Sequence, residues 1–376
     1  MKDHKQSQND FSKVRVVHIS TVHSSSDHRL LDKECKTLAE AGFDTFLIAR
    51  ADKDYTKFGV QVLAFPTYKS RISRATIGVW KITLRAISLK PKIAHIHDPE
   101  LLWSSWIFRL FGIKFIYDSH EHVPNQITSK PWIKPTWFRR LIAFFASGYE
   151  HFFCLFANKV ISVVPEIVER FPENKRLMIR NFPPFDSSQP PIDHIKTKKI
   201  VAIYAGGLTR IRGIAEIIQA FAELGSGFEL RLLGPWDTED FRADCMSNAG
   251  ENVKYLGLVS PAEVSKQIRQ ADIGLAILYP VKNYLMSYPV KAFEYMKEGV
   301  PIVMSSFPYW KELYSSCAEF VDPHDISQIK EAIETLGKSP EKRTEFGLSG
   351  YRLVKEVYNW ESEGENLKEA YLSLLK

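Results

Sequence analysis

Short runs rich in β-branched residues alternate with longer amphipathic stretches along the chain, and this alternation restricts the possible folds more than any other feature. The N-terminal half contains the runs VRVVHIS, DTFLIAR, VQVLAFP, IAHIHD, KFIYDSH and KVISVV. Several runs are apolar at successive positions, which is typical of strands that helices cover on both faces. The pattern predicts repeated strand–helix–strand units and therefore a doubly wound parallel sheet of the α/β class.

A proline-rich segment, NFPPFDSSQPP at 181–191, interrupts this alternation. Proline disfavours both helix and central strand, so the segment is expected to link two domains. The pattern then starts again with KIVAIYAG, FELRLLGP, VKYLGLV, ADIGLAIL, PIVMSS and AEFVD. A chain of 376 residues usually divides into two cores. We therefore expect Rossmann-like domains at 1–185 and 192–359, followed by a terminal helix at 360–376.

Composition excludes several classes of protein. The 50 Lys and Arg residues exceed the 44 Asp and Glu residues by only six, and no dense basic run with interleaved aromatics occurs, so nucleic acid is not expected as a partner. The first thirteen residues lack the apolar core of a secretory signal. Glu150 and His151 interrupt the most apolar region, so no membrane span is expected. The four scattered cysteines lack the spacing of a zinc or redox site. We expect a cytoplasmic protein that can bind the inner face of the cell membrane.

The loop after the first predicted strand excludes a common ligand class. Its sequence, STVHSSSDHR, has no glycine, whereas an enzyme that binds NAD or FAD should show GxGxxG there. The second half opens instead with YAGGLTRIRG, in which Gly206 and Gly207 end a strand and Arg210 and Arg212 add two cations. Glycine permits close backbone approach, and guanidinium groups bind phosphate oxygens in pairs. The loop predicts a diphosphate cradle, and a tight turn with two solvated arginines is the alternative.

A second segment, MSYPVKAFEYMKEGVPIVMSS at 286–306, has the features of an anion-binding helix start. Pro289 suits the first turn of a helix, whose free amides would point at an anion while Lys291 adds charge. Glu294 lies on the same helix face, and its carboxylate can accept hydrogen bonds from both hydroxyls of a ribose. The alternative is an exposed ion pair between Lys291 and Glu294.

Four motifs together, YAGGLTRIRG, PVKAFEYMKEGVPIV, HIHDPELL and YDSHEHVP, resemble family 4 retaining glycosyltransferases. The resemblance implies the GT-B fold, in which two Rossmann-like doubly wound domains face a central cleft and the terminal helix packs back on the N-terminal domain. It implies that Arg212 holds the donor diphosphate, Glu294 the ribose, and that His120 lies near the donor sugar. Gly207 and Met286 depart from the common pattern, where an arginine and an acid are usual. The PxKxxEYM form resembles a recurring variant of the family.

The predicted site comprises three groups of residues. The catalytic candidates are His120, Arg212, Lys291 and Glu294. The donor-binding candidates are Gly206, Gly207, Leu208, Arg210, Arg212, Gly234, Pro235, Trp236, Leu258, Val259, Tyr288, Pro289, Val290, Lys291 and Glu294. The acceptor-side candidates, at the ends of N-terminal strands, are Ser25, His28, Arg29, His97, Asp98 and Glu121.

No metal and no cofactor are expected, because cations and helix amides can stabilise the charge of a leaving diphosphate. Two metal-binding alternatives exist in the sequence. One is a DKD turn at 52–54, which a solvated loop explains more simply. The other is a cluster with ligand chemistry suited to zinc or iron, formed by His95, His97, Asp98, His120, Glu121 and His122.

We expect a hexosyltransferase that moves a sugar, with retention, from a nucleotide diphosphate donor to a glycan or lipid-linked glycan in surface polysaccharide synthesis. A UDP-sugar is favoured over a GDP-sugar, and the sugar and acceptor stay open. A nucleotide-sugar epimerase of the same fold and a catalytically silent nucleotide-sugar-binding protein are the alternatives.

Basic, aromatic stretches at 67–90 and 130–145 have the composition of peripheral membrane segments. Ordinary core helices with cations on the wet side explain them as well.

Overall fold

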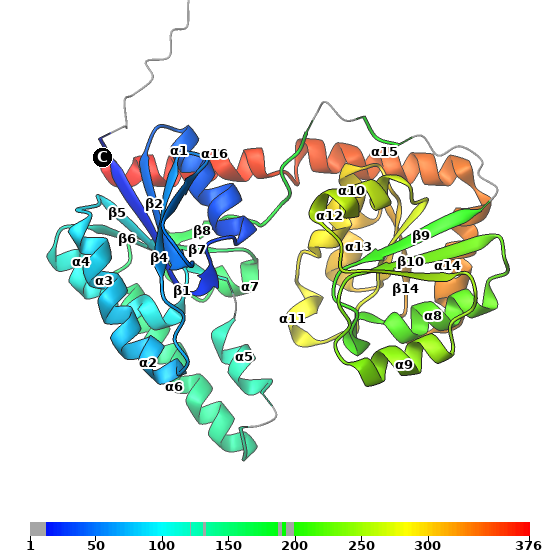
Figure 1. The fold of residues 1–376 in the computed structure, drawn as a ribbon, viewed down its shortest axis with the longest axis horizontal. Helices are drawn as coiled ribbons and strands as arrows, with labels where there is room; N and C mark the ends of the chain where they lie inside the picture. The colour runs from blue at the N-terminus through cyan, green and yellow to red at the C-terminus, as the bar shows by residue number, and fades with distance from the viewer. Residues whose placement is uncertain (1–12, 121, 131–132, 187–189, 193–198) are drawn as a thin grey trace, which may run out of the picture. The chain divides into compact units, whose positions relative to one another are not determined.

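The computed structural model describes residues 13–120, 122–130, 133–186, 190–192 and 199–376 (Figure 1). The chain forms two compact units, and the first boundary between them lies at the start of the proline-rich segment. Unit 1 comprises Met1–Asn181 and Ser362–Lys376, and unit 2 comprises Phe182–Glu361. Among the described helices, none combines the length and hydropathy that a bilayer span requires.

Unit 1 contains an eight-stranded sheet in the order β3-β4-β2-β1-β5-β6-β7-β8. All neighbouring strands are parallel except β3 and β4. The strands are β1 Arg15–Ser24, β2 Asp44–Arg50, β3 Tyr55–Lys57, β4 Val60–Phe65, β5 Ile93–Ile96, β6 Lys114–Ser119, β7 Lys159–Ser162 and β8 Arg176–Met178. The helical segments are η1 His28–Cys35, α1 Lys36–Glu40, α2 Arg71–Ser73, η2 Arg74–Gly78, α3 Val79–Ser88, η3 Pro99–Ser104, α4 Ser105–Leu110, α5 Val123–Thr128, α6 Thr136–Cys154, α7 Pro165–Val168, η4 Glu173–Lys175 and most of α16 Trp360–Leu375.

Unit 2 contains a six-stranded parallel sheet in the order β11-β10-β9-β12-β13-β14. The strands are β9 Ile200–Ala205, β10 Phe228–Leu233, β11 Val253–Gly257, β12 Ile273–Ala276, β13 Ile302–Ser305 and β14 Ala318–Val321. The helical segments are η5 Arg210–Arg212, α8 Ile214–Glu223, α9 Glu239–Ser247, α10 Pro261–Arg269, α11 Lys282–Leu285, α12 Val290–Lys297, α13 Pro308–Tyr314, α14 Ile326–Lys338 and α15 Pro340–Glu356.

The expected α/β class is confirmed, because each unit is a doubly wound sheet covered by helices. Every run singled out in the sequence forms a strand. The analysis missed β3 and β8, since each has only three residues and is too short to show alternation.

Strand order determines where ligands can bind in each sheet. In unit 1 the chain winds outward in both directions from β1, which lies between β2 and β5. In unit 2 the corresponding point is β9, which lies between β10 and β12. Loops that leave the carboxyl ends of neighbouring strands diverge at such a switch point and leave room for a ligand. The segments that follow β1 and β5, and those that follow β9 and β10, are therefore the places to examine for function.

Candidate active site

The loop after β9 contacts the loop after β10 through the backbone. The Gly206 amide donates to the Leu233 carbonyl at 2.8 Å. A side-chain carbon on Gly234 would lie 2.1 Å from the Gly206 carbonyl oxygen, and Gly234 has a φ of 129°. Only glycine fits there, because any larger residue would push the two loops apart. The glycines therefore hold the β9 loop bare and fixed at the switch point.

Two cations converge on this bare loop from different elements. A side-chain carbon on Gly206 would lie 3.4 Å from Nη1 of Arg212 and 3.4 Å from Nζ of Lys291. Arg212 belongs to the same loop, whereas Lys291 comes from the first turn of α12. Nη1 of Arg212 also donates to the Gly207 carbonyl at 3.3 Å. The space above Gly206 is thus bordered by two like charges, which suits a dianionic phosphate group.

The surroundings of the Lys291 ammonium disfavour its charged form. Its Nζ is buried and makes no hydrogen bond among the described residues, and it lies 3.4 Å from the ring centroid of Tyr204. Burial, followed by the like charge of Arg212, lowers the pKa of Lys291 well below its ordinary value, although Glu294 opposes the shift. An anion bound beside Lys291 would supply the missing partner and raise this pKa.

Tyr204 is a site residue that the sequence analysis missed. It is fully buried at the end of β9, and its hydroxyl donates to the Gly207 carbonyl at 3.2 Å. Its ring supports the Lys291 ammonium, and burial raises the pKa of Tyr204 to about 12. The signal was present as the aromatic residue in YAGG, but a strand-end tyrosine is usually a core residue.

Arg210 does not join the two converging cations. Its guanidinium lies 4.6 Å from the ring centroid of Phe241 and 3.7 Å from a carboxylate oxygen of Asp244, both on α9. The exposed ion pair carries little energy. Of the two arginines in the loop, only Arg212 lies at Gly206. The second cation there is Lys291 and not Arg210. Glu294 lies one turn further along α12 and is half-buried.

The other donor-binding candidates surround the β9 and β10 loops or begin α12. The Leu208 amide donates to the Pro235 carbonyl at 2.8 Å, and Leu208 pairs with Trp236 in an isolated bridge. Leu258 and Val259 follow β11, and Leu258 is largely exposed. Tyr288, which precedes α12, accepts a hydrogen bond from the Tyr309 hydroxyl at 2.6 Å. Pro289 is the residue before the first turn of α12, and Val290 is exposed.

In unit 1 most acceptor-side candidates are buried and already have partners. The Asp98 carboxylate accepts from the Thr21 amide at 2.6 Å and from the Ser20 hydroxyl at 2.9 Å, so it organises the end of β1. Arg29 is buried between Asp118 and Glu34, with 2.9 Å to each carboxylate. His97 is buried between two other histidine rings. All three side chains are buried and have partners within unit 1, and their acceptor-side role stays a prediction.

The remaining acceptor-side candidates are Ser25, His28 and Glu121. Ser25 is buried, and its hydroxyl accepts from the Tyr55 hydroxyl at 3.1 Å. His28 is exposed, but its ring lies 2.6 Å from the Asp32 carboxylate. Glu121 lies outside the described residues.

Two histidines at the strand ends are accessible. The His120 side chain is 17% exposed at the end of β6, and the His23 side chain is 29% exposed at the end of β1. Their ring centroids are 5.2 Å apart. A hydrogen bond to Asp27 raises the pKa of His23, whereas burial lowers the pKa of His120. The sequence analysis took Ser25, His28 and Arg29 from this loop as acceptor-side candidates and did not include His23.

The metal-cluster alternative does not form with the predicted membership. His122 caps α5 by accepting from the Asn125 amide at 3.2 Å, and Asp98 faces the β1 loop. Two other sets bring ligand atoms within 4.8 Å of one another: His18, Glu34, His95 and His97 in one, and His97, Asp118 and His120 in the other. The Arg29 guanidinium already compensates both carboxylates. An added cation would lie next to that positive charge, so a hydrogen-bonded network fits these residues better than a metal.

Asp54 of the DKD turn at 52–54 also has partners within the fold. The Asp54 carboxylate accepts from the Ala64 amide at 2.6 Å and lies 3.4 Å from the Arg85 guanidinium. These contacts connect the turn to β4 and α3.

Two known protein families match the chain in sequence. Residues 28–176 match the family described as Glycosyltransferase Family 4. Residues 210–369 match the family described as Glycosyl transferase-like. A comparison with curated proteins finds no match. One match thus lies in unit 1, and the other covers most of unit 2 and continues into the terminal helix.

Solved structures resemble the chain over nearly its whole length. A sucrose-phosphate synthase from Thermosynechococcus elongatus has a TM-score of 0.75 at 16% identity, covering 96% of this chain and 99% of that chain. HepE of Anabaena, in complex with UDP and glucose, has a TM-score of 0.68 at 13% identity, covering 96% and 100%. WaaG, a glycosyltransferase involved in lipopolysaccharide biosynthesis, has a TM-score of 0.67 at 13% identity, covering 95% and 99%. These similarities show the fold.

The chain is a glycosyltransferase with the GT-B fold, because glycosyltransferase families match both of its units and its neighbours share this architecture. The match of residues 28–176 supports family 4 in particular.

Proposed function

We propose that this enzyme transfers a sugar from a nucleotide diphosphate donor that binds at the β9 loop of unit 2. The observation that carries the proposal is the convergence of Arg212 and Lys291 on the bare backbone of Gly206. Two similar proteins support the choice of donor: HepE was solved with UDP-glucose, and the trehalose-phosphate synthase of Burkholderia xenovorans is described as UDP-forming. A UDP-sugar is therefore our first choice of donor.

The arrangement of charges suits departure of a nucleoside diphosphate. Breaking the glycosidic bond of the donor places negative charge on the leaving phosphate oxygen. Arg212 and Lys291 are fixed in advance where that charge develops, and such preorganised cations lower the barrier most when water is excluded. Glu294 is proposed to hold the ribose hydroxyls, and His120 to contact the donor sugar. We propose retention of configuration, with the leaving phosphate as the base for the incoming hydroxyl.

A donor screen tests this function and separates it from the alternatives. Thermal unfolding with UDP-, GDP- and ADP-sugars identifies the base, since a ligand that binds the native state raises the unfolding temperature. Turnover is then followed with and without an extract of glycan acceptors. A transferase needs acceptor beyond slow hydrolysis, an epimerase converts the donor alone, and a silent binding protein shows a thermal shift without turnover. Absence of both binding and turnover would contradict the proposal.

Metal independence is a further part of the proposal. EDTA is expected to leave the rate of sugar transfer within about twofold of its original value, because Arg212 and Lys291 already supply the positive charge. Initial rates with EDTA, and after addition of magnesium or manganese, check this. Loss of activity with EDTA and its recovery with either ion would instead favour one of the histidine-containing sets.

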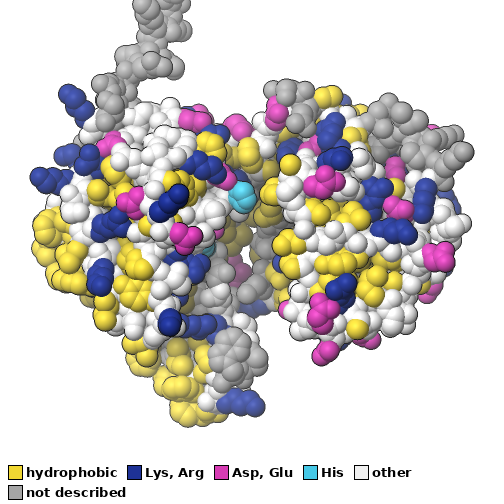
Figure 2. All heavy atoms as spheres, viewed as in Figure 1, with side chains coloured by type: hydrophobic (Ala, Val, Ile, Leu, Met, Phe, Trp, Pro, Cys, Tyr) yellow, Lys and Arg dark blue, Asp and Glu magenta, His cyan; other side chains and the backbone are white. Residues whose placement is uncertain are grey.

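Unit 1 exposes a large apolar surface. Three helical segments at 71–88, 105–111 and 136–154 expose large hydrophobic side chains, which we call the apolar face: Ile72, Ile77, Trp80, Leu84, Trp106, Leu110, Phe111, Trp137, Phe138, Leu141, Phe144, Phe145 and Phe152. In Figure 2 hydrophobic side chains gather where Figure 1 places α2 and α6. Monomeric soluble proteins rarely expose so many together, so the face is expected to contact a partner.

The apolar face joins the two stretches that the sequence analysis treated separately. Trp80 of α3 stacks on Trp103 of η3 with a centroid distance of 6.0 Å. The Trp103 amide donates to the Tyr149 hydroxyl of α6 at 3.1 Å. Hence α3 and α6 flank η3, and α4 continues the surface. The aromatic side chains of 136–145 are exposed, which favours a peripheral membrane segment over an ordinary core helix for this stretch. Trp132 lies outside the described residues.

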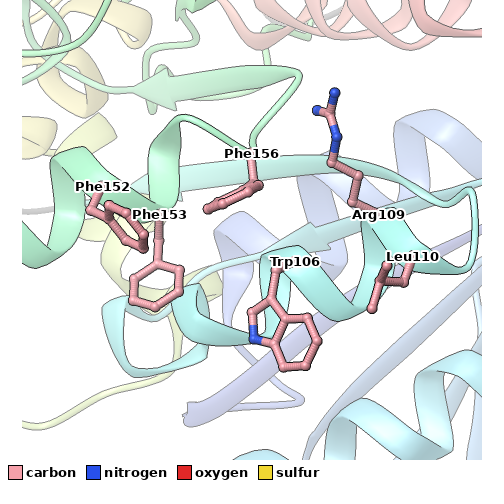
Figure 3. A pocket seen from close by; sticks show the side chains of 6 residues that line it. All are labelled: Trp106, Arg109, Leu110, Phe152, Phe153 and Phe156. Atoms are coloured by element: carbon pink, nitrogen blue, oxygen red, sulfur yellow. The ribbon is translucent and has the colours of Figure 1, made fainter.

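The same face contains a hollow of about 590 Å³ between α4 and the end of α6 (Figure 3). Trp106, Leu110, Phe152, Phe153 and Phe156 line it, and Arg109 extends from its edge. The volume falls within the range of small-molecule pockets, and the lining is apolar. A hydrocarbon chain fits this chemistry, with a cation available at the rim for an anionic head group.

We therefore propose that the apolar face binds an anionic membrane and that the acceptor is a lipid-linked glycan of surface polysaccharide synthesis. Aromatic side chains anchor at the membrane interface, and basic residues beside them attract anionic lipid. Exposed Lys134 and Arg140 each lie three residues from Trp137 in the sequence, whereas Arg139 donates to the backbone carbonyls of Thr128 and Lys130 and has a structural role. WaaG, one of the similar structures, is described as involved in lipopolysaccharide biosynthesis.

Liposome sedimentation tests this proposal. The protein is expected to bind vesicles with anionic lipid at low salt and to dissociate at high salt. Replacing both Lys134 and Arg140 with glutamate should weaken binding, since each basic residue near the surface contributes about 1 kcal/mol. Phe144→Ser with Phe145→Ser should weaken it as well, because both rings are more than half exposed. Val357→Ser, an exposed apolar residue of unit 2, is the matched control. No binding at low salt would leave a soluble acceptor as the better interpretation.

A further inference from the structure

A line of ring contacts in unit 1 connects the terminal helix with His120. The Tyr371 hydroxyl of α16 lies 3.0 Å from Nε2 of His18, and Nδ1 of His18 lies 2.9 Å from Nε2 of His97. Nδ1 of His97 lies 3.1 Å from Nε2 of His120. At the other end, Nδ1 of His95 lies 2.8 Å from the Tyr371 hydroxyl. Of these residues only His120 is partly exposed. Its Nε2 contacts His97, and its Nδ1 takes no part in the line.

The inner rings of this line are neutral. Burial lowers the pKa of His18 to about 3, and it lowers the pKa of His95 and of His97 well below the ordinary value. A neutral imidazole carries one N–H, so it donates from one nitrogen and accepts at the other. Because His18 and His97 use both nitrogens within the line, the position of one proton determines the positions of all the others.

The inner end determines which of the two directions is adopted. Nε2 of His95 is buried and has no hydrogen-bond partner among the described residues. A proton on Nε2 would be a buried N–H without an acceptor, and such groups are rare in native proteins. A proton on Nδ1 instead donates to the Tyr371 oxygen. The Tyr371 hydroxyl then donates to His18, His18 donates from Nδ1 to His97, and His97 donates from Nδ1 to Nε2 of His120.

We propose that Tyr371 and His18 are positioning residues, which act through His97 to hold His120 in the tautomer with its proton on Nδ1. In this tautomer Nε2 is occupied as an acceptor, and the ring presents an N–H donor at Nδ1. His120 therefore donates a hydrogen bond to an oxygen of its ligand and does not accept a proton from it. The catalytic consequence rests on the proposed function, whereas the tautomer itself does not.

Nitrogen NMR of the protein labelled with ¹⁵N-histidine tests the proposal, because a protonated and a bare ring nitrogen differ strongly in chemical shift. The His120 signals are assigned by their loss in His120→Gln. We expect bare Nε2 and protonated Nδ1 for His120 in the native protein. Tyr371→Phe removes the hydroxyl that directs the line, and a second population of His120 with its proton on Nε2 is expected to appear.

Two further variants separate the effect of hydrogen-bond direction along the line from the effect of side-chain packing. His95→Phe keeps a ring at this buried position but removes the donor that orients the Tyr371 hydroxyl, so the second population of His120 is expected here as well. Tyr314→Phe removes a buried tyrosine hydroxyl that has no described hydrogen-bond partner and should change no histidine signal. Thermal unfolding checks that each variant is folded.

The outcomes are distinct from those for the proposed function. A proton on Nε2 of His120 in the native protein, or an unchanged tautomer in folded Tyr371→Phe, would overturn the proposal whatever the activity. If the enzyme transfers sugar, Tyr371→Phe should also lower kcat by up to about tenfold, as expected when one hydrogen bond is misdirected. Absence of turnover in the native protein would contradict the proposed function and leave the NMR result valid.

Discussion

Arg212→Ala is expected to weaken binding of a nucleoside diphosphate by about 1.5 to 3 kcal/mol, the usual effect of losing a charge-assisted hydrogen bond. The reason is that Nη1 of Arg212 lies at the bare backbone of Gly206, where the diphosphate is proposed to bind. Isothermal titration calorimetry with UDP measures the change, and inorganic pyrophosphate serves as a second ligand. Arg212→Ala should weaken binding of both ligands, because it removes a phosphate contact.

Two companion variants make this result specific. Arg210→Ala removes an arginine two residues away, but that side chain contacts Phe241 and Asp244, so its effect should stay within about 0.5 kcal/mol. Glu294→Ala should weaken UDP binding by a similar amount to Arg212→Ala and leave pyrophosphate unaffected, because its proposed contact is the ribose. Equal effects of the two arginine variants, in folded protein, would contradict the assignment of Arg212.

Lys291→Met is expected to abolish most donor binding and, at the same time, to stabilise the free protein by about 1 to 2 kcal/mol. A buried cation without a hydrogen-bond partner costs free energy, and methionine removes that cost while keeping the length of the side chain. The pKa of Lys291 is lowered on folding, so the unfolded state binds more protons between the folded and unfolded pKa values. Stability should therefore rise with pH across that window in the native protein, and this dependence should be absent in Lys291→Met.

Chemical denaturation at several pH values measures the stability, and calorimetry in buffers of different ionisation enthalpy measures proton uptake. Binding of a diphosphate should raise the pKa of Lys291 and take up protons. The control is Lys297→Met on the same helix, where the ammonium is partly exposed and lies 3.8 Å from Glu298. A loss of stability in Lys291→Met would mean that the lysine supports the fold, and it would argue against an anion site.

The sequence predicted the fold well because strand alternation is a local signal. Each run of β-branched residues indicates a buried strand by itself, and the proline-rich segment at 181–191 marks where the first unit ends. The same locality explains the donor side. Gly206, Gly207 and Arg212 lie in one loop, and Lys291 and Glu294 lie in one helical turn, so the sequence spacing was enough to group them as one candidate site.

The burial of the acceptor-side candidates could not be predicted, since a strand-end position does not indicate which way a side chain points. Arg29 and His97 follow the expected strands, yet both are buried and support other residues. The line from Tyr371 to His18 joins positions 353 residues apart, and no spacing rule connects them. Likewise, the apolar face combines three segments whose shared exposure becomes visible only when η3 brings α3 and α6 together.

The most direct test of the donor site compares a nucleoside diphosphate with its own nucleoside. The base is chosen as whichever of UDP, GDP and ADP gives the largest thermal shift, and both affinities are measured by calorimetry. We predict that the native protein binds the diphosphate at least about a hundredfold more tightly than the nucleoside, which corresponds to roughly 2.7 kcal/mol from the phosphate contacts. In the double variant Arg212→Ala, Lys291→Met this difference should shrink to less than about tenfold. Equal affinities in the native protein, or an undiminished difference in the folded double variant, would contradict the account.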